Sequence, residues 1–174
     1  MTRIAAVLWN WIERVSLWFL WIFCRLFGKG QTKETEEAFL QFVRFGIVGV
    51  SNTAAHYVIY AATLFFLQSH GWLKDADYLV ATAIAFALSV LWSFFWNYKF
   101  VFTLEEGERR PVFPALVKTY VSYSFTGLFL NSILMLFWVQ AVHISEYIAP
   151  VFNLLISVPI NFLMNKFWAF KKER

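Results

Sequence analysis

Asparagines inside long apolar stretches are the residues of this sequence with the clearest chemical meaning. They are Asn52, Asn97, Asn131, Asn153, Asn161 and Asn165. An amide with no hydrogen-bond partner is costly in hydrocarbon, so each of these side chains must meet another helix or a polar ligand. Both interpretations stay open, because hydrogen bonds between membrane helices are common and modest in energy.

Basic residues mark the ends of the same apolar stretches, at Arg44, Lys99, Lys118 and Lys166. Each lies within a turn or two of a helix end on one side of the membrane, so together they form a layer of cations able to meet a phosphate. The alternative is that they only snorkel to the interface and set topology. Lys99 and Lys166 are the preferred phosphate ligands, since both follow a repeated asparagine.

His56 lies one helical turn beyond Asn52 on the same face of a predicted helix. A histidine buried there would either couple a proton to transport or act as a neutral hydrogen-bonding residue. The predicted binding residues are therefore Arg44, Asn52, His56, Asn97, Lys99, Lys118, Asn131, Asn165 and Lys166.

The sequence has no Gly-rich phosphate loop, no Cys/His zinc spacing and no Ser/His/Asp pattern. We therefore expect no catalytic residues, no metal and no cofactor, and we do not expect an enzyme. The net charge of +4 does not indicate a nucleic-acid partner, because the cations lie at the ends of apolar segments instead of on a basic face.

These residues must be positioned by membrane helices. Hydrophobic residues make up 60% of the 174 residues and charged residues only 15%, a balance that indicates a lipid environment. Apolar stretches at residues 42–67, 78–98, 113–142 and 147–165 have about the 20-residue length of a spanning helix. They lack strict alternation, so the predicted fold is an all-α membrane protein with four transmembrane helices, the last one kinked at Pro159.

The distribution of Lys and Arg predicts the orientation of these helices. The loops on one side and the chain ends carry nearly all of the cations, while Lys74 alone lies on the other side. Because cations are retained in the cytoplasm, we expect both termini to be cytoplasmic.

Residues 4–27 have the length of a span but carry Glu13 and Arg14 in the middle. Polar residues gather on about a third of the helical circumference at ~100° per residue, which favours an amphipathic helix lying in the cytoplasmic surface over a fifth span. The predicted organisation is this interfacial helix and its polar connector at 1–39, followed by the transmembrane domain at 40–171.

The second and fourth stretches end in similar motifs, FFWNYKFVF at 94–102 and FLMNKFWAF at 162–170. Phe94, Asn97 and Phe102 correspond to Phe162, Asn165 and Phe170 at a constant offset. The halves also begin alike, with FVRF at 42–45 and LVKT at 116–119. The four helices are therefore predicted to arise from a duplicated two-helix unit, with an axis along the membrane normal.

The opening RFGIVGVSNT (44–53) and the two closing segments SFFWNYKFVF (93–102) and NFLMNKFWAF (161–170) resemble the GtrA-like family of small membrane proteins. The resemblance covers about residues 40–171. It implies that the chain moves polyprenyl-phosphate-linked monosaccharides across the cytoplasmic membrane of a prokaryote for cell-surface polysaccharide glycosylation. Where many relatives have an acidic residue four positions after the first asparagine, this chain has His56.

The resemblance also implies partners: the lipid-linked sugar, the bilayer and a membrane glycosyltransferase that charges the lipid carrier. A homo-oligomer is expected as well, since four helices enclose little volume. One alternative function is a non-transporting partner that recruits or activates the glycosyltransferase through the N-terminal helix. A small proton-coupled exporter of cationic compounds is disfavoured, because no carboxylate lies inside the four stretches.

Overall fold

The structure is a computed structural model that describes residues 3–26, 30–73, 76–145 and 148–172. These residues form the helices α1 (Arg3–Leu26), α2 (Lys33–Ser69), α3 (Asp77–Trp96), α4 (Val112–Ser124), α5 (Asn131–Leu136) and α6 (Ala149–Met164). π-helical turns extend or join them: η1 (Asn97–Val101), η2 (Phe125–Leu130), η3 (Phe137–Ala141) and η4 (Asn165–Ala169). The chain divides into two compact units, Met1–Ile47 and Val48–Arg174, which are described separately below.

The first unit holds α1 and the beginning of α2. Glu13, one of the charges inside the apolar run of α1, accepts a bond from Arg44 Nη2 at 3.3 Å. Arg44 also lies over the ring of Trp9, 5.0 Å from its centroid. The N-terminal stretch is a helix, α1, as expected. Its placement in the membrane surface stays a prediction.

Helix α2 begins earlier than its apolar stretch. It continues without a break from Lys33 to Ser69 and so takes in most of the polar connector. Glu34 and Glu36 lie in its first turn, where acidic side chains favour the positive end of the helix dipole. The predicted boundary between residues 39 and 40 falls inside this helix, and that division of the chain stays a prediction.

Three helices within the described ranges are long and apolar enough to cross a membrane: Lys33–Ser69, Asp77–Val101 and Val112–Ala141. The last is the continuous run from α4 through η3. Helix α6 with η4 is shorter and carries several asparagines, so its role as the fourth span stays a prediction. Pro150 lies in the first turn of α6, where proline is tolerated, and Pro159 lies inside the helix.

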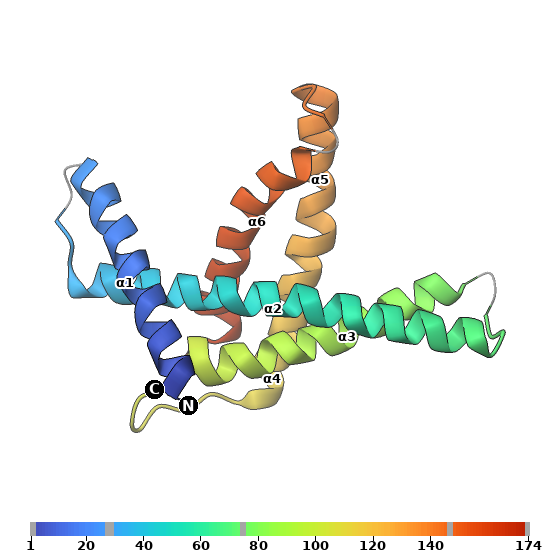
Figure 1. The fold of residues 1–174 in the computed structure, drawn as a ribbon, viewed down its shortest axis with the longest axis horizontal. Coiled ribbons are helices and arrows are strands. Elements are labelled where there is room, and N and C mark those ends of the chain that lie inside the picture. Colours follow the sequence, from blue (N-terminus) through green and yellow to red (C-terminus); the bar gives the residue numbers. More distant parts are fainter. Residues whose placement is uncertain (1–2, 27–29, 74–75, 146–147, 173–174) are drawn as a thin grey trace. The chain divides into compact units, whose positions relative to one another are not determined.

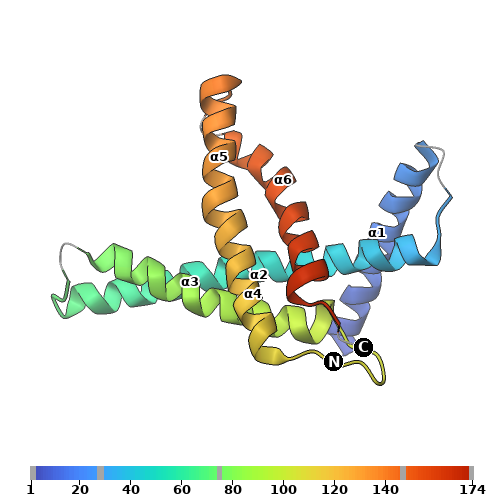
Figure 2. The same cartoon turned by 180° about the vertical axis from the view of Figure 1, so that it is seen from behind.

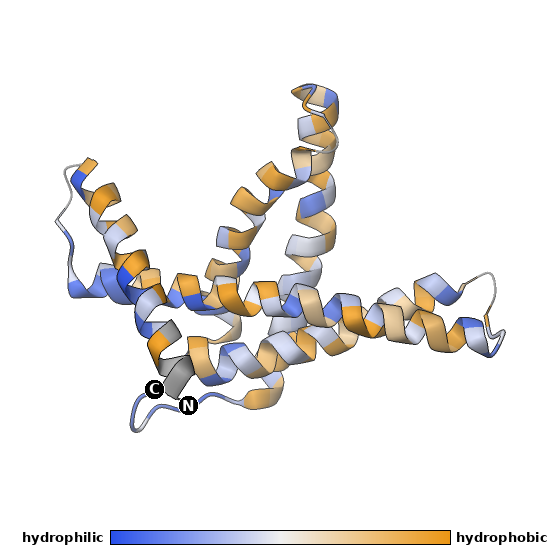
Figure 3. Ribbon diagram, viewed as in Figure 1, coloured by the Kyte–Doolittle hydropathy of each residue, from blue (hydrophilic) through white to orange (hydrophobic). Residues whose placement is uncertain are grey.

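The second unit is built from two helical hairpins (Figures 1 and 2). In the first, α2 and α3 are joined by bonds between Trp92 Nε1 and Ser51 Oγ at 3.2 Å and between His56 Nδ1 and Ser89 Oγ at 3.3 Å. In the second, the run from α4 to η3 packs on α6. Figure 3 shows apolar residues along the hairpin helices and polar residues in the loop that joins the hairpins.

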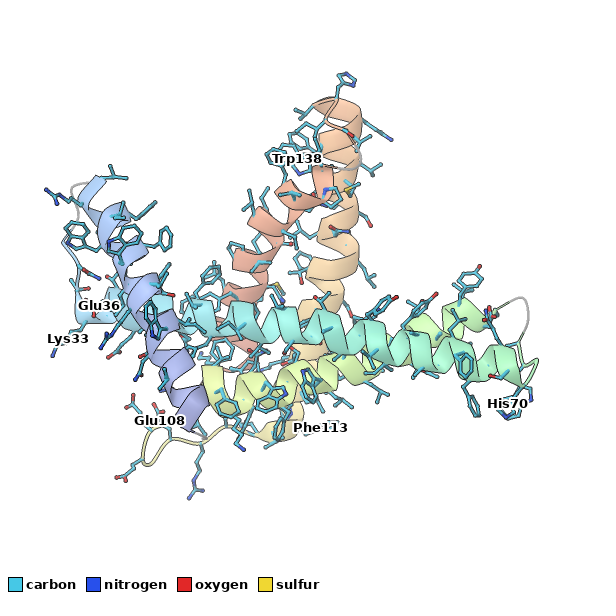
Figure 4. All side chains as sticks on the ribbon, in the orientation of Figure 1. Lys33, Glu36, His70, Glu108, Phe113 and Trp138 are labelled. Carbon is cyan, nitrogen blue, oxygen red and sulfur yellow. The ribbon has the colours of Figure 1, made fainter. Side chains whose placement is uncertain are left out.

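The tip of each hairpin carries an aromatic or histidine side chain. His70 lies at the turn after α2, and Trp138 lies near the end of the second hairpin (Figure 4). His143 follows that hairpin helix with a φ of 60°, a left-handed conformation that histidine adopts more readily than most residues. The two histidines thus lie at the turns of the two hairpins.

Candidate functional site

The two hairpins meet at their closing motifs, through an aromatic cluster formed by Phe94, Tyr98, Phe102, Phe162 and Phe170. Phe94 stacks on Phe170 with ring centroids 5.6 Å apart, and Phe162 stacks on Phe102 at 6.0 Å. The two contacts are equivalent, because Phe94 corresponds to Phe162 and Phe170 corresponds to Phe102 in the repeat. Phe102 and Phe170, which correspond to each other, also stack directly at 4.6 Å. The cluster therefore has the pseudo-twofold arrangement expected of a duplicated unit.

Both closing motifs contain a π-helical turn at the same place, η1 from Asn97 and η4 from Asn165. The N–H of Phe102 donates to the carbonyl of Asn97 at 2.9 Å, and the N–H of Phe170 donates to that of Asn165 at 2.7 Å. Single π-helical turns inside α-helices are frequent at functional sites. The repeated asparagines thus occupy matching and unusual backbone positions.

Beside the aromatic rings lies a polar cluster, formed by Ser93, Asn97, Tyr123, Asn161 and Asn165. Asn97 Nδ2 donates to Ser93 Oγ at 3.1 Å, and Ser93 bonds to the hydroxyl of Tyr123. Asn165 Nδ2 donates to Asn161 at 3.0 Å to Oδ1 and 2.8 Å to the carbonyl. Tyr123 also interacts with the amides of Asn97 and Asn161, so the cluster bridges both repeats.

The polar cluster has unused hydrogen-bond acceptors. Asn97 and Asn165 are fully buried, yet their Oδ1 atoms have no hydrogen-bond partner among the residues that the structure describes. A buried acceptor without a donor costs about 1–3 kcal/mol. Such oxygens can accept hydrogen bonds from water or from a ligand with hydroxyl or amine groups.

Arg110 lies at the edge of the aromatic cluster, in the loop that joins the two hairpins. Its guanidinium donates through Nη1 to the carbonyl of Phe102 at 2.9 Å. It also lies over the rings of Tyr98 and Phe170, at 5.3 and 5.1 Å from their centroids. Burial lowers the pKa of Arg110 from its ordinary value because desolvation disfavours the charge. A buried cation thus borders the aromatic cluster.

An ion pair holds the same loop to the end of the chain. Lys172 Nζ lies 2.7 Å from Glu108 Oε2 and 3.9 Å from Glu105 Oε1. The hydrogen bond from Lys172 lowers the pKa of Glu108, and a bond from the backbone N–H of Glu105 lowers it further. The loop after the first hairpin is therefore tied to the residues that follow η4.

The four predicted cations have different surroundings. Lys99 is exposed and its Nζ lies 5.5–5.6 Å from the ring centroids of Phe100 and Phe95 on its own helix. Lys166 Nζ lies 5.6 Å from the ring centroid of Phe162, so it borders the aromatic cluster. Lys118 is half-buried on α4 beside the buried Thr119. Arg44 bonds to Glu13 in the first unit.

The predicted amides and histidine separate into three groups. Asn97 and Asn165 come together with Asn161 in the polar cluster. Asn131 instead accepts a bond from Asn153 Nδ2 at 2.7 Å within the second hairpin. Asn52 lies on α2 with a buried Oδ1 that bonds to no described residue, and His56 bonds to Ser89. The bond between Asn131 and Asn153 packs the second hairpin, although the Oδ1 of Asn153 also bonds to no described residue.

Comparison with known families identifies the part of the chain that holds these residues. The family model of the GtrA/DPMS transmembrane domain matches residues 44–170. The chain belongs to the GtrA/DPMS transmembrane-domain family. Membership identifies a membrane protein connected with the processing of polyprenyl-phosphate sugars. No curated protein and no solved structure matches the chain.

The GtrA/DPMS match ends at Phe170, the last ring of the aromatic cluster, and therefore contains the whole polar cluster. Helix α1 lies outside it. Arg110 lies inside it but was missing from the predicted site, since its sequence position in a charged loop indicates only topology. Its burial depends on contacts with Tyr98 and Phe170, which sequence spacing does not reveal.

Sequence reasoning also missed a stripe of small and polar residues along α3. Its buried members recur at every fourth position: Ala81, Ala85, Ser89, Ser93 and Asn97. The corresponding positions of the second repeat are Ala149, Asn153, Ser157, Asn161 and Asn165. Small residues at this spacing let membrane helices approach closely. The signal was present in the sequence as a period of four that continues through both closing motifs.

Proposed function

We propose that this GtrA/DPMS-family protein flips polyprenyl-phosphate-linked monosaccharides across the cytoplasmic membrane of a prokaryote, for glycosylation of cell-surface polysaccharides. Family membership supplies the substrate class. The observation that carries the proposal is the polar cluster, in which Asn97 and Asn165 present buried acceptors that bond to no described residue. Sugar hydroxyl groups are donors, so a monosaccharide head group has the chemistry that these oxygens require.

The arrangement also suits the other parts of such a substrate. The polyprenyl tail would stay in lipid, beside helices whose outer faces are apolar. The single phosphodiester charge would lie near the cytoplasmic ends of the helices, where the family domain carries its cations. In this proposal the chain crosses the membrane four times with both termini in the cytoplasm. A membrane glycosyltransferase would charge the lipid carrier.

Reconstitution tests this function directly. Purified protein is placed in vesicles that carry a glycosyl polyprenyl phosphate in one leaflet, and the sugar that becomes protected in the other leaflet is measured over time. We expect protection well above that of protein-free vesicles. Equal rates with and without protein would remove flipping as the function.

A second candidate is recruitment or activation of the glycosyltransferase, and an observation on α1 favours it. This helix lies outside the family match and exposes large apolar side chains, including Trp11, Trp18 and Phe19. Exposed aromatic residues of this kind serve as anchors in interfaces between proteins or with membrane surfaces. Deleting residues 1–30 separates the two candidates. If the glycosyltransferase no longer associates with the protein while transport is retained, the N-terminal helix has a docking role. If only transport is lost, the docking role is contradicted.

A further inference from the structure

Arg110 has one occupied and one open edge. Its Nη1 donates to the carbonyl of Phe102 at 2.9 Å. The Nε and Nη2 atoms lie on the other edge of the guanidinium, and neither has a hydrogen-bond partner among the described residues. That second edge is the fork with which arginine binds carboxylate or phosphate through two parallel hydrogen bonds. The contact with Phe102 thus leaves the bidentate edge unused.

The open edge is also buried. Only 6% of Arg110 is exposed, and the rings of Tyr98 and Phe170 lie against its guanidinium. A buried cation with unused donors is unfavourable unless an anion meets it. Its burial by aromatic rings also raises the strength of any charge–charge contact made there, because the local dielectric is low.

The nearest carboxylate in the loop does not occupy this edge. Glu108 Oε2 accepts bonds from Lys172 Nζ at 2.7 Å and from the backbone N–H of Glu105 at 2.8 Å. These bonds hold the Glu108 side chain on the loop, where Figure 4 shows it. Glu108 and Arg110 attract each other through their charges, but the two donors on the open edge of Arg110 have no acceptor among the described residues.

We propose that the open fork of Arg110 binds the phosphate of the lipid carrier, with Tyr98 and Phe170 holding the guanidinium in place. This assignment rests on the proposed function for its ligand. It deepens that function by moving the phosphate contact from Lys99 and Lys166 to an arginine in the loop between the repeats. The position is consistent with a head group lying in the polar cluster, since both border the same aromatic rings.

Binding of a glycosyl polyprenyl phosphate to the full-length protein in nanodiscs tests the fork. Arg110→Lys keeps the charge but has no planar fork, so we expect its affinity to fall about tenfold or more, the scale of a charged hydrogen bond. Arg109→Lys is the matched control at the exposed neighbouring arginine, and it should stay within about twofold of wild type. Equal affinities of the two variants would overturn the proposal.

Two further probes identify the source of the phosphate. A polyprenol of the same chain length, which lacks phosphate, should bind wild type and both variants equally. Inorganic phosphate at millimolar concentration should leave lipid binding unchanged. Displacement of the lipid by inorganic phosphate, with the same dependence on Arg110, would assign the fork to soluble phosphate and overturn the lipid assignment.

A measurement on the wild-type protein covers the case in which the Arg110 variant fails to fold. A glycosyl polyprenyl phosphate with a photoreactive group beside the phosphate should crosslink to the segment 98–111 or to Phe170. Crosslinks confined to the peptides around Lys118 would overturn the site. If binding depends on Arg110 but the protein does not transport the lipid, the phosphate site stands and flipping is removed as the function. If the protein transports the lipid but binding does not depend on Arg110, flipping stands and the phosphate site is overturned.

Discussion

Phe102 and Phe170 stack with ring centroids 4.6 Å apart and an interplanar angle of 21°, although they end different repeats of the chain. Each residue corresponds to the other, so the pseudo-twofold axis passes between the two rings. Both are buried, and Arg110 contacts the pair through the carbonyl of Phe102 and the ring of Phe170. The contact joins the two hairpins next to the polar cluster.

Truncating either ring should destabilise the protein. Phe102→Ala or Phe170→Ala should cost about 3–5 kcal/mol of unfolding free energy, the usual range for a buried phenylalanine. The double variant should cost less than the sum of the single variants, by about 0.5–1.5 kcal/mol for the lost pair. Unfolding in mixed detergent micelles measures these values, and Phe167→Ala, at a ring that is 65% exposed, is the control. Full additivity would contradict direct coupling of the rings.

Enlarging a residue of the α3 stripe should disturb the packing of that helix. Ala85 has no exposed surface, and Ala85→Leu should cost about 1–3 kcal/mol by overpacking. Ala83 is exposed on the same helix, so Ala83→Leu serves as a control of identical chemistry. Thermal unfolding in detergent should separate the two variants clearly. If both unfold together with wild type, the stripe does not pack.

The repeated asparagines should matter for transport beyond their effect on stability. Asn97→Ala and Asn165→Ala each remove a buried acceptor, and a lost hydrogen bond of about 1 kcal/mol corresponds to a transport rate about fivefold lower. Rates are normalised to folded protein in the vesicle assay. Asn10→Ala, at an exposed position outside the family match, is the control. Variants that unfold more easily but transport at the wild-type rate would show a purely structural role.

The ion pair between Glu108 and Lys172 should make stability depend on pH. The pKa of Glu108 is lowered in the folded protein, so its contribution is present above the unfolded value of about 4.3. This stabilising contribution is lost as pH falls through the lower pKa that Glu108 has in the folded protein. Wild type should therefore melt above Glu108→Gln at pH 7, with the difference shrinking below about pH 4. Glu106→Gln, in the same loop and exposed, should show no comparable change.

Accessibility labelling should place both closing motifs on one side of the membrane. In a Cys24→Ser background, Lys99→Cys and Lys166→Cys should react with an impermeant thiol reagent only from the cytoplasmic face. His70→Cys and His143→Cys should react only from the other face. Labelling of Lys99→Cys and Lys166→Cys from opposite faces would contradict the duplicated topology and the proposed sugar path with it.

Much of the fold could be predicted from the sequence, because the formation of membrane helices depends on the length and apolarity of each stretch. The length and apolarity of the stretches from residue 42 onward predicted helices, and the offset between Asn97 and Asn165 predicted a repeat whose π-helical turns then coincided. The sequence left open whether the polar connector is helical or flexible, since a polar segment that continues a helix has no apolar period to mark it, and the structure begins α2 at Lys33.

The site depended on the tertiary structure, because hydrogen-bond partners are chosen by helix packing between distant residues. Sequence alone determined which residues are polar within apolar helices, and the constant offset between the closing motifs paired Asn97 with Asn165. Only the packing of the hairpins decided that these amides meet Tyr123 and that Asn131 pairs with Asn153 instead. The same packing decided that Arg110 is buried, since the two rings that lie against it, Tyr98 and Phe170, come from different repeats.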